Sequence, residues 1–111
     1  MIMKYLTMIS LLGISLAGGT AGAADAKALY DKNCAKCHGP DGAGKTKMGR
    51  QSGVKDYTDP KVQAEMKDDA AMQAIRDGIV EKGKKKMDPY KDKLSDDEIK
   101  SLIALMRSFK K

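Results

Sequence analysis

The stretch that decides the fold of this 111-residue chain is Cys34-Ala35-Lys36-Cys37-His38. It holds the only two cysteines and the only histidine of the sequence. A zinc site usually needs four protein ligands, and no further cysteine or histidine is present to complete one. A thioredoxin-like redox pair requires a strand–helix–strand setting, which this sequence does not show. A disulfide across so short a loop would stabilise the fold only slightly.

The C-x-x-C-H spacing instead predicts covalent attachment of a haem. Two thiols at this spacing each add to one vinyl group, and the next residue is then placed to bind the iron from the same side. We therefore expect Cys34 and Cys37 to hold one haem c through thioether bonds. His38 is the expected proximal axial ligand of the iron.

The first 24 residues differ from the rest of the chain, because Lys4 is their only charge. A short apolar run, residues 5–17, is followed by small residues that end in Ala21-Gly22-Ala23. This pattern predicts a signal peptide, residues 1–23, that is cleaved near Ala23. The run is short for a membrane span, which needs about 20 mainly apolar residues. We expect export to the periplasm and one domain, residues 24–111, with an uncleaved anchor as the alternative.

The composition leaves little material for a core, since the chain has four tyrosines, one phenylalanine and no tryptophan. A domain of this size is marginal unless another group fills or staples its interior. A bound haem would supply a large flat apolar group for the helices to pack around.

Helix signals recur along the chain, and no segment alternates like a strand. Asp25–Cys37 is predicted to be helical, and the glycine-rich stretch from His38 to Gly49 is predicted to form turns. A helix starting near Pro60 is predicted to end at Met66, and another to run from Asp68 or Asp69 to Gly78. The last helix follows a capping box of Ser95 and Glu98, with an apolar stripe of Ile99, Leu102, Ile103 and Met106. The fold class expected is all-α, with about three to five short helices.

From Ala24 onward the chain resembles a small bacterial class I cytochrome c. The resemblance rests, in this order, on CAKCHGPDGAG (34–44), Met87-Asp88-Pro89-Tyr90 and the ending KDKLSDDEIKSLIALMRSF (91–109). It implies the class I cytochrome c fold wrapped around one covalently bound haem. Ala26, Leu105 and Asp88 replace residues that are common in the family, and Pro40 is the only nearby proline whose carbonyl could orient His38. We expect the crossing of the first and last helices to survive these exchanges.

The second axial ligand cannot be histidine within one chain, because His38 is the only one. Methionine sulfur suits haem iron and raises its reduction potential. Met66, Met72 and Met106 are assigned to packing by their helical positions. Met87 lies in a lysine-rich loop before Pro89, and the resemblance points to the same residue as the distal ligand. Met48, in the glycine-rich stretch, is the alternative.

The net charge of +6 is concentrated around Met87. We expect the six lysines around Met87 to rim the haem edge and to steer the protein toward acidic redox partners. The alternative is that they form a merely solvated loop. No nucleic-acid motif is present, and we expect a monomer without stable membrane insertion after cleavage. The lysines are Lys82, Lys84, Lys85, Lys86, Lys91 and Lys93.

With both axial positions filled, no substrate reaches the iron, and the sequence offers no general base or nucleophile. The function expected is therefore that of an electron carrier and not an enzyme. The alternative is a haem protein with an open sixth position that reacts with, or senses, a gas or peroxide.

Overall fold

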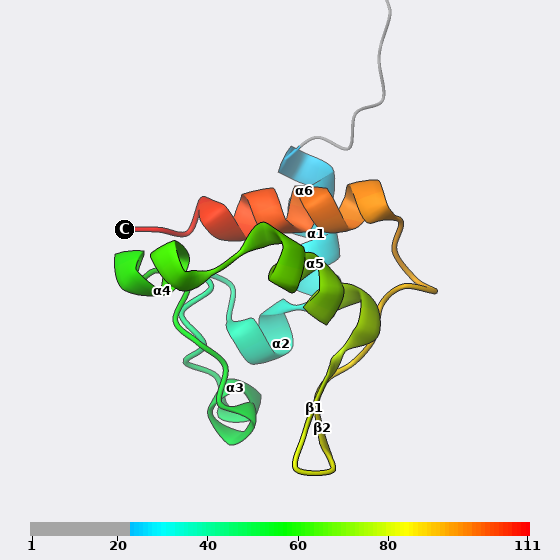
Figure 1. The fold of residues 1–111 in the computed structure, drawn as a ribbon. Helices are drawn as coiled ribbons and strands as arrows, with labels where there is room; N and C mark the ends of the chain where they lie inside the picture. Colours follow the sequence, from blue (N-terminus) through cyan, green and yellow to red (C-terminus); the bar gives the residue numbers. More distant parts are fainter. Residues whose placement is uncertain (1–22) are drawn as a thin grey trace, which may run out of the picture.

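A computed structural model describes residues 23–111 (Figure 1). The predicted signal peptide lies outside the described residues, except for its last residue, Ala23, where the first helix begins. Along the chain the elements are α1 (Ala23–Asn33), α2 (Ala35–His38), α3 (Lys47–Ser52), α4 (Pro60–Glu65), α5 (Asp68–Asp77), β1 (Ile79–Glu81), β2 (Lys84–Met87) and α6 (Asp96–Arg107). No helix within residues 23–111 has the length and apolar character needed to cross a membrane.

The predicted helix boundaries are confirmed where local hydrogen bonds set them. The Asp59 carboxylate accepts from the Lys61 backbone N–H at 2.9 Å, and Pro60 opens α4. Ser95 Oγ accepts from the Glu98 N–H at 3.1 Å, while Glu98 Oε1 accepts from the Ser95 N–H at 2.9 Å. Both side chains of this capping box satisfy backbone donors that α6 itself leaves without partners.

The prediction of a mostly helical fold is confirmed, but the expectation that no strand forms is wrong. Strands β1 and β2 pair as one antiparallel hairpin, and Val80 of this hairpin is 67% exposed. Its turn, Lys82 and Gly83, has φ angles of 52° and 75°. A hairpin in which no residue is fully buried needs no alternation of apolar and polar residues, so the pattern that usually marks a strand is missing.

The helix count also exceeds the expected range, since the structure assigns six helices to the described residues. The helix predicted for Asp25–Cys37 is broken at Cys34, which separates α1 from α2. The stretch predicted to form only turns, His38 to Gly49, includes the first residues of α3, because Thr46 caps the start of this helix by accepting from the Gly49 N–H at 2.9 Å.

The first and last helices cross and pack against each other, as the sequence predicts (Figure 1). Ala26 is only 2% exposed, so a small side chain at this position lets α1 approach α6 closely. Leu105 packs against the edge of the core, and the apolar stripe predicted for α6 is buried. The core consists of Tyr30, Ile75, Leu94, Ile99, Leu102, Ile103 and Met106.

A buried amide connects α4 to the end of α6. Gln63 is 5% exposed, and its Nε2 donates to the carbonyls of Tyr57 at 2.6 Å and Met106 at 2.8 Å. Arg107 donates to the carbonyls of Gln63 and Met66 at 2.7 and 2.6 Å. This network fixes the segment before α4, which carries Tyr57 toward the candidate site.

Candidate haem site

The C-x-x-C-H motif forms a short helical turn that continues from α1 after a break at Cys34. The Cys34 N–H donates to the Tyr30 carbonyl at 2.8 Å, and the His38 N–H donates to the Cys34 carbonyl at 2.9 Å. The two cysteines do not form a disulfide with each other. Burial raises the pKa of the Cys34 thiol to about 11, an environment suited to a neutral thioether.

The backbone around His38 is held by three hydrogen bonds. Thr46 Oγ1 donates to the Cys37 carbonyl at 2.8 Å, and the Gly44 N–H donates to the His38 carbonyl at 2.7 Å. The buried hydroxyl of Tyr30 donates to the Gly39 carbonyl at 2.6 Å. Since every carbonyl from Cys37 to Gly39 has a donor, the position of the imidazole is set by a backbone with little freedom.

Helix α3 approaches the motif so closely that only glycine fits at position 49. A Cβ on Gly49 would overlap the Cys37 carbonyl oxygen. This contact places α3 directly against α2, on the side of the motif away from α1.

The imidazole of His38 is partly buried against the ring of Tyr57, with ring centroids 5.8 Å apart. Its Nδ1 is a buried atom with no hydrogen-bond partner in the structure, so the Pro40 carbonyl does not accept from it. Burial lowers the pKa of His38, which favours the neutral imidazole that binds metal ions. A partly buried neutral imidazole beside two thiols is a donor set that fits a covalently attached haem iron.

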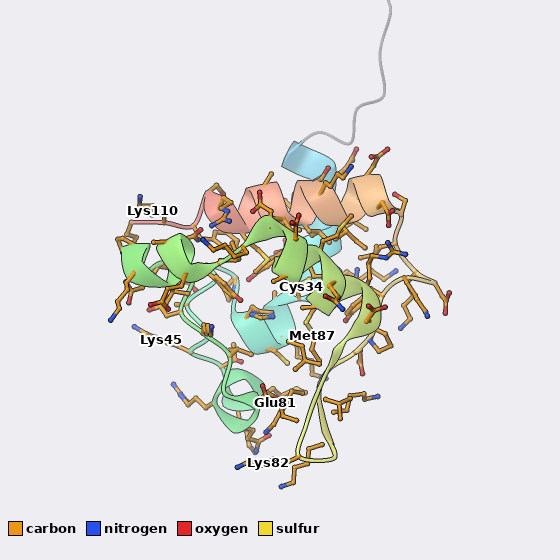
Figure 2. All side chains as sticks on the ribbon, viewed as in Figure 1. Cys34, Lys45, Glu81, Lys82, Met87 and Lys110 are labelled. Carbon is orange, nitrogen blue, oxygen red and sulfur yellow. The ribbon has the colours of Figure 1, made fainter. Side chains whose placement is uncertain are left out.

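Met87 lies at the end of β2 and packs, partly buried, against the same core that Cys34 contacts. Figure 2 shows Cys34 and Met87 in the middle of the molecule, with Lys82 at the tip of the hairpin. The Tyr90 hydroxyl, three residues further on, donates to the Asn33 carbonyl at 3.0 Å. The segment that carries Met87 is thereby attached to the residue immediately before Cys34.

Among the methionines of residues 23–111, Met48 is set apart, whereas Met66 and Met72 border the core as Met87 does. Met48 is 39% exposed on α3 and does not belong to the core or its border. Met66 and Met72 border the core, and Met106 is buried in it, as their helical positions predict.

Some residues that shape the site were not anticipated from the sequence, namely Tyr30, Thr46, Gly49 and Tyr57. Thr46 could have been found, because it precedes α3 with the spacing of a helix cap. The roles of Tyr30 and Tyr57 depend on contacts with residues far along the chain, which no local pattern records.

A helical fold built around a C-x-x-C-H turn and faced by a methionine segment defines a class I c-type cytochrome. Residues 21–106 match the family described as Cytochrome C oxidase, cbb3-type, subunit III, and the chain belongs to this family of cytochrome c domains. It carries one covalently bound haem c, and the pair Cys34 and Cys37 fits this attachment.

Solved structures of c-type cytochromes are similar over most of this chain. The KustC0563 c-type cytochrome is 35% identical with a TM-score of 0.69, covering 78% of this chain and 98% of that one. A tyrosine-to-phenylalanine mutant of Kustc0563 is 34% identical with a TM-score of 0.68, covering 78% and 99%. No curated protein gave a match. The predicted class I cytochrome c fold is therefore confirmed.

The close approach of Gly78 to the Met87 segment yields a prediction with a matched control. Both Gly78 and Gly83 have positive φ, at 74° and 75°. A Cβ on Gly78 would lie 2.5 Å from the Met87 carbonyl oxygen and 2.9 Å from the Pro89 nitrogen, whereas a Cβ on Gly83 would meet nothing within 4 Å.

Gly78→Ala should therefore displace the Met87 segment and lower the reduction potential, measured by mediated redox titration. Gly83→Ala also places a Cβ at a positive φ, at a cost of roughly 1 kcal/mol, but without the collision, and its potential should stay at the wild-type value. Equal shifts in the two variants would show that backbone strain, and not the contact with Met87, is responsible.

Proposed function

We propose that this cytochrome is a periplasmic carrier of single electrons between redox proteins. In this proposal Cys34 and Cys37 form the thioether bonds, His38 is the proximal iron ligand and Met87 is the distal one. The observation that supports it most directly is that the Met87 segment is attached by Tyr90 to Asn33, beside the attachment motif. The bound haem supplies the one-electron couple, and its axial ligands tune the potential.

The residues of the chain have distinct tasks in this function. His38 is held by the fixed backbone of its own turn and by the ring of Tyr57. Met87 keeps the sixth position closed to water and to small ligands. Cytochrome c domains of this family are typically electron carriers rather than enzymes.

Asp88 follows the proposed ligand directly and replaces a residue that is common in the family, so its surroundings bear on the alternative of an open sixth position. Its carboxylate forms an ion pair with Lys85 at 2.9 Å, and both side chains are more than half exposed. This pair, together with its hydrogen bond, holds the pKa of Asp88 below its usual value. The carboxylate is therefore engaged at the surface, which favours the closed, Met87-ligated carrier.

Replacing Met87 tests the ligand assignment. Met87→Ala should lower the reduction potential by on the order of 100 mV and allow the ferrous protein to bind carbon monoxide at neutral pH. Met48→Ala is the matched control, because Met48 is exposed and should leave both properties unchanged. Spectra with and without carbon monoxide and a redox titration measure these effects. Ready carbon monoxide binding by the wild-type protein would instead support the gas-reactive or sensing alternative.

Two basic segments support docking to acidic redox partners. The hairpin and the residues after it carry Lys82, Lys84, Lys85, Lys86, Lys91 and Lys93. Residues 45–55 carry Lys45, Lys47, Arg50 and Lys55 without an acidic residue between them. α3 packs against α2, and the hairpin ends at Met87, so both segments border the candidate haem site. Val80 and Met48, the exposed large apolar residues of the described chain, lie one on each segment.

Neutralising the hairpin should slow electron transfer to an anionic oxidant. The Lys82→Gln/Lys84→Gln variant should reduce ferricyanide about two- to fivefold more slowly at low ionic strength, with the difference vanishing at high salt. Lys110→Gln/Lys111→Gln removes the same charge from the C-terminus, where Figure 2 shows Lys110 far from Lys82. Stopped-flow rates that fall equally in both variants, or in neither, would exclude a steering role for the hairpin.

Export to the periplasm is supported by the pattern of residues 1–23. The remaining residues, 24–111, would then form the mature cytochrome domain. Haem is attached covalently outside the cytoplasm. The use of the two cysteines for thioethers, and not for a disulfide, is therefore consistent with export.

A further inference from the structure

Tyr90 connects the end of α1 to the segment that carries Met87. Asn33 is the last residue of α1, and the last carbonyls of a helix lack partners within it. The Cys34 N–H satisfies the Tyr30 carbonyl, and the Asn33 side chain satisfies the Leu29 carbonyl at 3.0 Å. The Tyr90 hydroxyl satisfies the Asn33 carbonyl at 3.0 Å. Tyr90 thus caps α1 from a position 57 residues further along the chain.

The ring of Tyr90 is held on several sides. It borders the core, and the Lys93 ammonium lies 5.6 Å from its centroid. The Tyr90 N–H donates to the Ile75 carbonyl at 2.9 Å, which fixes its backbone to α5. Because Tyr90 is held in this way, it can fix the Met87 segment relative to α1.

Only Asp88 and Pro89 separate Met87 from Tyr90. Pro89 reduces the freedom of this connection, since its ring fixes its own φ near −65°. On its other side, the Met87 carbonyl lies against Gly78. The backbone of Met87 is therefore fixed between the contact with Gly78 and the hydrogen bond of Tyr90.

We propose that Tyr90 is a positioning residue whose hydrogen bond to the Asn33 carbonyl keeps the Met87 segment closed over the haem site. This inference rests on the proposed role of Met87 as distal ligand. Moving Met87 away from the iron strains or breaks this hydrogen bond, so the bond resists loss of the ligand. An added ligand that competes with Met87 binds in proportion to the fraction of open protein.

Tyr90→Phe keeps the ring and removes the hydroxyl, and imidazole binding to the ferric holoprotein reports the open fraction. A hydrogen bond of this kind changes an equilibrium constant by about three- to tenfold. The apparent Kd for imidazole should fall by this factor in Tyr90→Phe, and the reduction potential should fall with it.

Ser108→Ala is the comparison, because it also loses one hydrogen bond from a side-chain hydroxyl to a carbonyl in the last turn of a helix, that of Leu105 in α6. It should leave the Kd for imidazole within about twofold of wild type. An unchanged Kd in Tyr90→Phe, or an equal decrease in both variants, would overturn the inference.

Met87→Ala separates this inference from the proposed function. It should bind imidazole more tightly than wild type whether or not Tyr90 acts as proposed. If it does not, Met87 is not the distal ligand, and the proposed roles of Met87 and Tyr90 both fail.

Discussion

The covalent link between the C-x-x-C-H turn and the haem is the constraint on which the rest of the molecule depends. The protein side of the core is a small cluster of seven residues, of which only Tyr30 is aromatic. Cys34, Tyr57, Met87 and Tyr90 border this cluster without being fully buried in it. Their partial exposure is the expected condition of side chains that pack on one side against the protein and on the other against a prosthetic group. The haem is thus both the redox centre and the missing part of the core.

A consequence of this arrangement is that the chain fixes its backbone around the motif from several directions. The carbonyls of Asn33, Cys37, His38 and Gly39 all accept hydrogen bonds from donors outside α2. These donors come from α1, from the loop that leads into α3 and from the segment after β2. A stiff turn costs conformational entropy on folding, but it keeps the ligand geometry similar in both oxidation states, as rapid electron transfer requires.

The features predicted from the sequence are those set by neighbouring residues. The start of α4 follows from Pro60 and Asp59 and that of α6 from Ser95, and the hydrogen bonds of Asp59 and Ser95 close within three positions. The spacing of Cys34 and Cys37 is equally local, and it led to the haem and to the family. The axial roles of His38 and Met87 stay predictions, which the structure supports by packing Met87 against the same core as Cys34 of the motif.

The features that were missed depend on distant contacts or on an unusual environment. The hairpin has no strand pattern because its side chains are exposed or only half-buried. α3 was missed because Gly49, a poor helix former, stands where only glycine fits against the Cys37 carbonyl. The hydrogen bond between Tyr90 and Asn33 joins residues 57 positions apart, so only the folded chain shows it.

The most direct test of this account is the thermal unfolding of a haem-free chain, Cys34→Ala/Cys37→Ala, followed by circular dichroism. If haem completes the core, this variant has too little buried apolar surface to fold as a unit. The account predicts low helicity and no cooperative transition, whereas the haem-bound wild type unfolds cooperatively. A cooperative transition with native helicity in the haem-free variant would contradict it.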